Sequence, residues 1–223
     1  MNLTFSDLLP LLPLLLVTAT VVVLMLVIAI KRSHFITCSV TVLGLLVAAI
    51  AAMVLLPGAN QQVTPLLIVD QYSLFFTLVT CVAALFISVM SYPYLLQLDD
   101  HAEEFYLLLA LATIGAIVMV SSNHFISAIL GIETLSMSLY GMIAYPIHSK
   151  NAAKYPLEAS VKYLVLSAVS SGALLFGMAL IYAQTGSLEF SGLAEVSAAG
   201  TGSLSGVNES FYVVALMLLS AGM

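Results

Sequence analysis

A single glutamate, Glu133, lies in the middle of an apolar run that is long enough to cross a membrane as a helix. The run extends from Asn123 to Tyr145 and contains no Asp, Lys or Arg. An acidic side chain at the centre of a transmembrane helix costs roughly 2.5–3.5 kcal/mol, so a carboxyl at this depth is a candidate functional group. Because a carboxyl can bind and release a proton, proton transfer is the first chemistry to consider.

The residues that follow Glu133 on the same helical face are mostly polar. Neighbours on a helix lie three, four and seven positions apart, and these positions hold Ser136, Met137 and Tyr140. Hydroxyl groups therefore extend from the carboxyl toward the Tyr145 end of the helix.

A second apolar run, Leu157–Ala183, carries Lys162 and a similar series of hydroxyls. The series consists of Tyr163, Ser167, Ser170 and Ser171. Consecutive antiparallel helices are natural packing neighbours. An ammonium about 7 Å from the glutamate would favour its ionised form by roughly 2.4 kcal/mol at an effective dielectric of about 20. We predict a proton relay through Glu133 and Lys162, supported by Ser136, Tyr140, Tyr163, Ser167 and Ser170. The sequence leaves open whether the two charged groups are in contact, either directly or through one water molecule.

Structural roles remain open for the same residues. Glu133 can be a hydrogen-bonded staple between helices, and Lys162, near a helix end, can extend to the lipid headgroups. The serines can serve close helix packing, because small hydroxylated residues let helices approach one another.

The composition indicates an all-α membrane protein with several spans. Hydrophobic residues make up 62% of the 223 residues and charged residues only 7%, more apolar than a soluble core requires. Cys38 and Cys81 lie in apolar runs without a nearby His or Cys at metal-ligand spacing. Without a nucleotide loop, a haem histidine pair or a cysteine cluster, we expect no redox cofactor, no metal site and no nucleic-acid partner.

Six runs are long enough to span a bilayer, which takes about 20 helical residues. They are Leu8–Ile30, Phe35–Leu56, Tyr72–Leu96, Phe105–Ser121, His124–Tyr145 and Leu157–Ala183. A seventh starts at Phe211 and reaches Met223 after 13 residues, and we expect it to be incomplete. Asp70 is expected to cap the third helix through the backbone amide of Ser73.

The basic loop residues predict the orientation in the membrane. Lys31 and Arg32 join the first two runs, and Lys150 and Lys154 join the fifth and sixth, so all four lie on one side. The positive-inside rule makes that side cytoplasmic and places the N-terminus outside.

Several segments, in unbroken order over most of residues 66–223, resemble the antiporter-like membrane subunits of respiratory complex I. They are Val69–Phe76, Glu104–Gly115, Val120–Asn123, Leu130–Tyr140 and Glu158–Ser167. The Leu-Ser-Met-Ser-Leu-Tyr segment after Glu133 resembles the N-type subunits of NADH-quinone oxidoreductase. The L-type and M-type subunits and the Mrp-type antiporters usually have Trp-Glu-x-x-Gly at this place.

The resemblance implies a fourteen-helix fold with two inverted five-helix repeats. Residues 1–96 would be three supporting helices, and 97–223 the first part of the first repeat. The family's fifth-helix glutamate falls on Glu133 and its sixth-helix lysine on Lys162, whereas its seventh-helix lysine would follow Met223.

The implied function is proton translocation in the membrane arm of a bacterial inner-membrane complex I, with quinone reduction occurring elsewhere in the assembly. The implied partners are the M-type subunit, the small K-type and J-type subunits and the lipid bilayer. An Mrp-type cation/proton antiporter and a purely architectural scaffold are the alternatives.

Overall fold

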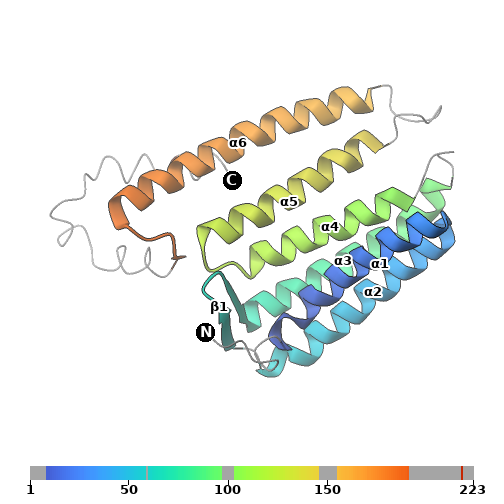
Figure 1. Ribbon diagram of the computed structural model, residues 1–223, viewed down its shortest axis with the longest axis horizontal. Coiled ribbons are helices and arrows are strands. Elements are labelled where there is room, and N and C mark those ends of the chain that lie inside the picture. The colour runs from blue at the N-terminus through green and yellow to red at the C-terminus, as the bar shows by residue number, and fades with distance from the viewer. Residues whose placement is uncertain (1–8, 59, 97–102, 146–154, 191–216, 218–223) are drawn as a thin grey trace.

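The computed structural model describes residues 9–58, 60–96, 103–145, 155–190 and 217 (Figure 1). Six of its helices are long and apolar enough to cross a membrane. They are α1 (Leu12–Ile30), α2 (His34–Leu55), α3 (Gln71–Leu95), α4 (Glu103–Val120), α5 (Phe125–Ala144) and α6 (Pro156–Thr185). The six predicted spans coincide with these helices, and the predicted all-α membrane fold is confirmed. Lys150, Lys154 and, apart from the helical Met217, the predicted seventh span lie outside the described residues.

The helices are arranged so that α5 lies between two different neighbours. Figure 1 shows α1, α2 and α3 grouped together, with α4 between this group and α5, and with α6 at the opposite edge. Contacts between the elements agree, since α4 packs on α1, α3 and α5, whereas α6 packs on α5. One side of α5 therefore meets the rest of the bundle, and another side meets α6.

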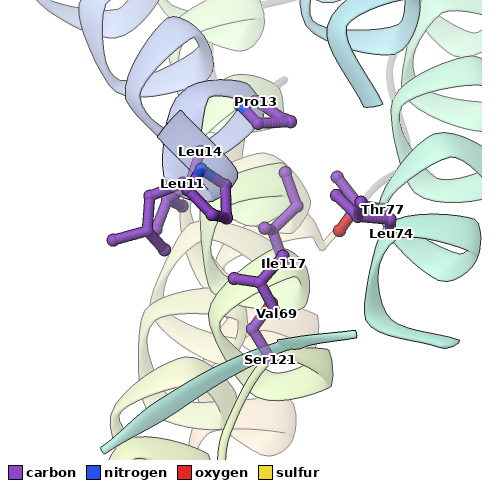
Figure 2. A pocket seen from close by; sticks show the side chains of 9 residues that line it. Leu11, Pro13, Leu14, Val69, Leu74, Thr77, Ile117 and Ser121 are labelled. Carbon is purple, nitrogen blue, oxygen red and sulfur yellow. The ribbon is translucent and has the colours of Figure 1, made fainter. Parts of the chain in front are cut away.

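The part formed by α1–α4 is closely packed. Val17, Leu45, Cys81 and Ile117 are almost completely buried and belong to one apolar cluster. A cavity of only about 10 Å³ lies where α1, α3, α4 and the strand before α3 meet. Figure 2 shows the side chains that line it. That volume is about the minimum for one water molecule, and no ionisable side chain lines the cavity.

Local sequence signals set the helix ends. Asp70 Oδ1 accepts a hydrogen bond of 2.7 Å from the backbone N–H of Ser73, and the Asp70 N–H donates to Ser73 Oγ at 3.0 Å. The predicted cap of α3 is confirmed as a reciprocal capping box. Pro156 occupies the first turn of α6, and Gly186 follows that helix with φ of 68°, a left-handed conformation that favours glycine.

An unpredicted layer of extended chain covers one end of the bundle. After the short 3-10 turn η2 (Leu56–Gly58), β1 (Asn60–Thr64) pairs antiparallel with β2 (Leu67–Asp70). The α4–α5 turn joins β2, since the Ile68 N–H donates to the Ser121 carbonyl at 2.9 Å. On its other side the same turn joins the segment after α6, because the Phe125 N–H donates to the Leu188 carbonyl at 3.0 Å. This layer fixes the end of α5 relative to α3 and α6.

Candidate functional site

Glu133 lies near the middle of α5, and its side chain is half-buried. Leu130 and Met137, its neighbours one turn before and after, are exposed at 58% and 64%. Ser136, by contrast, is buried. Glu133 therefore stands at the border between the side of α5 that meets α6 and a side left uncovered by the described residues.

A hydroxyl-lined cleft of about 310 Å³ opens between α5 and α6 beside this position. Its lining residues are Ile132, Ser136, Tyr163, Leu166, Ser167, Ser170, Ser171 and Leu174. The predicted polar residues Ser136, Tyr163, Ser167 and Ser170 are thus brought together in one space. The volume is large enough for several water molecules, and the hydroxyls supply the donors and acceptors that ordered water needs.

Tyrosine rings lie at the end of the cleft nearer the α5–α6 loop. Tyr140 and Tyr163 meet edge to face, with ring centroids 5.4 Å apart. One turn closer to the loop, Ser160 Oγ donates to the Tyr140 carbonyl at 2.9 Å. The predicted Tyr140 therefore contacts a residue that lines the cleft, although it is not itself part of the lining.

The other end of the cleft is apolar. Phe125 from α5 is buried against Leu174, Met178 and Ile181 from α6, and Ile132 packs against this cluster. Hydroxyl groups are therefore concentrated between an aromatic contact on one side and an aliphatic cluster on the other.

Lys162 lies on the face of α6 that points away from α5. Its Nζ is 2.6 Å from Glu158 Oε1, one turn earlier, and both side chains are more than half exposed. Five residues separate Lys162 from Ser167, which corresponds to about 140° around the helix. Within the described residues no ion pair joins Glu133 to Lys162. The direct contact that the sequence left open is therefore not formed.

On its opposite side, α5 is in direct backbone contact with α4. A Cβ atom added to Gly131 would lie 2.7 Å from the Met119 nitrogen and 2.8 Å from the Gly115 carbonyl oxygen. A Cβ added to Gly115 would lie 2.6 Å from the Leu135 nitrogen. Sequence reasoning missed this crossing, although two glycines near the middle of successive spans are a known signal for close helix approach.

The described part of the chain contains neither a cluster of metal-ligating side chains nor a disulfide. No group of three or more His, Cys, Asp or Glu side chains gathers there at metal-binding distance. Cys38 and Cys81 are buried and unbonded to each other. The chemistry of the α5–α6 region is that of one carboxyl, one exposed ion pair and a set of hydroxyls.

One family model matches part of the chain in sequence. Residues 122–223, which include Glu133, the cleft and Lys162, match the family described as "NADH:quinone oxidoreductase/Mrp antiporter, TM".

Solved structures extend the likeness to almost the whole chain. A chain of respiratory complex I from Thermus thermophilus with bound aureothin is 26% identical, with a TM-score of 0.74 over 94% of this chain. A chain of the membrane-bound sulfane sulfur reductase, an archaeal respiratory membrane complex, is 21% identical, with a TM-score of 0.77 over 96%. A chain of the Mrp complex from Dietzia sp. DQ12-45-1b is 19% identical, with a TM-score of 0.71 over 98%.

This chain spans 42%, 43% and 40% of the lengths of those three chains. All three chains belong to multi-subunit complexes. Their fold matches that of α1–α6 although their sequences are at most 26% identical to this chain. The chain therefore has the helical fold of these antiporter-like membrane proteins, and its residues 122–223 match the NADH:quinone oxidoreductase/Mrp antiporter family in sequence.

Proposed function

We propose that the chain is part of an N-type subunit of a bacterial NADH:quinone oxidoreductase and takes part in proton translocation. The observation that carries the proposal is the position of Glu133, one turn from Ser136, which lines the cleft between α5 and α6. The family match over residues 122–223 and the similarity to a chain of a respiratory complex I support it.

The chemistry of the proposed step follows from the site. A carboxyl in a region of low dielectric is stable when it carries its proton, and it releases that proton when water or another polar group can receive it. Water held by Ser136, Ser167 and Ser170 would provide this acceptor, because hydroxyls both donate and accept hydrogen bonds. Glu133 would thus bind a proton and pass it to the cleft.

Lys162 is proposed as the second charged group of the relay. Its ion pair with Glu158 is exposed on α6, on the face that does not meet α5. If the Lys162 ammonium left Glu158 and bound another hydrogen-bond acceptor, the positive charge would move and the electrostatic potential along α6 would change. Lys162→Gln, which removes the charge, is expected to lower proton pumping, while normal pumping by this variant would remove Lys162 from the relay.

The wider assignments belong to the same proposal. Residues 1–96 would be supporting helices, and 97–223 the beginning of an antiporter-like repeat. The Lys31–Arg32 end would face the cytoplasm and the N-terminus the outside of a bacterial inner membrane. The partners would be the M-type, K-type and J-type subunits of the membrane arm, in agreement with the multi-subunit complexes that contain similar chains.

The direct experiment is Glu133→Gln in the intact complex reconstituted into vesicles. The amide keeps the size of the side chain but cannot exchange a proton, so the number of protons moved per NADH oxidised should fall while assembly persists. Glu133→Asp, which keeps the acid, should retain part of the pumping. Normal pumping by Glu133→Gln would remove this carboxyl from the mechanism, and tolerance of neutral residues at both Glu133 and Lys162 would favour a scaffold.

An Mrp-type cation/proton antiporter is the second candidate, because the matching family includes both types. Purification of the native protein separates the two. Complex I predicts co-purifying subunits with flavin and iron–sulfur centres. An Mrp-type antiporter predicts cation/proton exchange without them.

A further inference from the structure

A second group of titratable residues lies at the other side of the bundle, around His34. His34 Nε2 is 2.9 Å from the hydroxyl of Tyr106. The imidazole also stacks on the ring of Tyr92, with centroids 4.4 Å apart. Tyr106 is completely buried, and His34 follows directly on the loop that carries Lys31 and Arg32. Residues from α2, α3 and α4 thus meet at the Lys31–Arg32 end of the bundle.

Glu103 adds a buried carboxylate to this group. Its exposed fraction is 8%, and it lies within electrostatic reach of the His34 imidazole. In residues 103–145 and the other described ranges, no hydrogen bond or ion pair involves its side chain. The adjacent Glu104 differs, because it is half-exposed and lies 3.7 Å from Arg32. The two neighbouring carboxylates therefore have different surroundings. Glu104 is partly exposed to solvent near Arg32, whereas Glu103 is buried within electrostatic reach of His34.

A buried hydroxyl continues the group into the bundle. Ser88 precedes Tyr92 by four residues, so it lies one turn deeper on the same face of α3. Ser88 is completely buried, and its Oγ has no hydrogen-bond partner among the described residues. Buried hydroxyls are nearly always satisfied, and water is the usual partner where protein groups are not at hand. Thr113 is buried two turns deeper than Tyr106 on α4, and its hydroxyl donates to the Leu109 carbonyl at 2.8 Å.

The other described residues packed around Tyr106 carry a thiol, phenol rings and apolar side chains. Cys38 on α2 and Tyr145, which directly follows α5, pack in the same cluster as Tyr106. Among the described residues around His34, the Glu103 carboxylate is the charged group that acts on the imidazole.

We propose that His34, with Glu103 and Tyr106, forms a second proton-exchanging site at the Lys31–Arg32 end of the bundle. A proton from the aqueous side binds to a ring nitrogen of neutral His34, and the carboxylate of Glu103 balances the charge of the imidazolium. Release of that proton toward the hydroxyl of Ser88 and associated water returns the neutral ring, and no other bond changes. The site lies across α4 and α5 from the α5–α6 cleft, and its purpose rests on the proposed function.

Chemical rescue tests the site in the intact complex in vesicles. His34→Ala should lower the protons moved per NADH oxidised by at least about fivefold. Added imidazole should restore at least half of the loss, whereas pyrrole, a ring of similar shape without a basic nitrogen, should not. Normal pumping by His34→Ala, or equal rescue by pyrrole, would overturn the proposal in favour of packing against Tyr92.

A matched pair of variants covers the case in which His34→Ala does not assemble. Glu103→Gln should lower pumping severalfold, while Glu104→Gln, the exposed neighbour, should pump like the unmodified complex. Equal pumping by both would overturn the site. Glu133→Gln in the same preparation separates this inference from the proposed function. If Glu133→Gln pumps normally while imidazole rescue persists, only the role of Glu133 fails. If Glu133→Gln is impaired and His34→Ala is not, only the His34 site fails.

Discussion

The two sides of α5 differ in how small residues are used. On the side of α4, Gly115 and Gly131 bring the two backbones into contact, and no space remains for even a Cβ atom. On the side of α6, serines line a cleft of about 310 Å³. Small residues therefore have two different effects in this bundle. The glycines let α4 and α5 come into backbone contact, whereas the serines between α5 and α6 leave a cleft.

This difference has a mechanical consequence for Glu133. The glycine crossing and the extended layer at the end of α5 hold the helix in one position relative to α4 and β2. The carboxyl is therefore carried by a fixed helix, while the space beside it is lined by hydroxyls and is large enough for water. A proton-transfer group requires such fixed geometry, because transfer depends on hydrogen-bond distances.

The largest effect is expected at the closed side. Gly131→Ala places a methyl group against backbone atoms that cannot rotate away, and overpacking of this kind costs about 1–3 kcal/mol. Gly172→Ala is the control, since its added Cβ would meet nothing within 4 Å. Thermal unfolding of the purified protein in detergent should show a lower Tm for Gly131→Ala alone. Equal Tm values for the two variants would contradict close contact between α4 and α5.

A smaller effect on stability, but a clear one on function, is expected at the open side. Ser167→Leu would fill part of the cleft without displacing backbone, so pumping should fall by roughly tenfold as the path for water-mediated transfer is interrupted. Ala168→Leu places the same side chain on an exposed face of α6. Proton translocation in vesicles should separate the two variants. If Ser167→Leu pumps as well as Ala168→Leu, the cleft carries no protons.

Removal of one hydroxyl should have a milder effect than filling the cleft. Tyr163→Phe keeps the edge-to-face contact with Tyr140 and loses one hydrogen-bonding group, which corresponds to about a two- to tenfold loss in rate. The pumping rate at constant complex content measures this. Complete loss of pumping would indicate that the hydroxyl itself transfers the proton, and an unchanged rate would limit Tyr163 to packing.

The smallest effect is expected on the far face of α6. Glu158→Gln removes the partner of Lys162 in an exposed pair four residues apart, and such pairs contribute about 0.3–0.5 kcal/mol to helix stability. The change in Tm should be near the limit of detection. A large loss of stability would show that this face is covered in the assembled protein and that the pair is buried there.

Much of the fold was predictable because the membrane imposes strong constraints on sequence. Six long apolar runs gave six helices, and the short-range rule for capping correctly predicted the role of Asp70. Helical periodicity placed Ser136 on one face of its helix and Ser167 and Ser170 on adjoining faces of the next, and the structure has all three in the lining of one cleft, while their role in proton transfer stays a prediction. These features depend on residues close together in sequence or on the periodicity of a single helix.

The features that were missed depend on contacts between distant residues. The β1–β2 pair and its extension to the α4–α5 turn could not be inferred from apolar runs, and His34 and Tyr106 are 72 positions apart. The position of Lys162, by contrast, could have been judged from the sequence, because helical geometry places it about 140° around α6 from Ser167. Its proximity to Glu133 was inferred from depth in the membrane, and the rotation of α6 decides against direct contact.

The most direct test of the account compares two serines on opposite sides of α5. In a protein with Cys38→Ala and Cys81→Ala, Ser136→Cys places a thiol in the cleft, and Ser138→Cys places one on the α4 side, seven residues from Gly131. Both serines are buried, at 6% and 3% exposed, so burial alone does not separate them. A small hydrophilic methanethiosulfonate reagent should modify Ser136→Cys in the assembled complex and leave Ser138→Cys unmodified. Equal modification of both, or of neither, would contradict a water-accessible cleft beside Glu133.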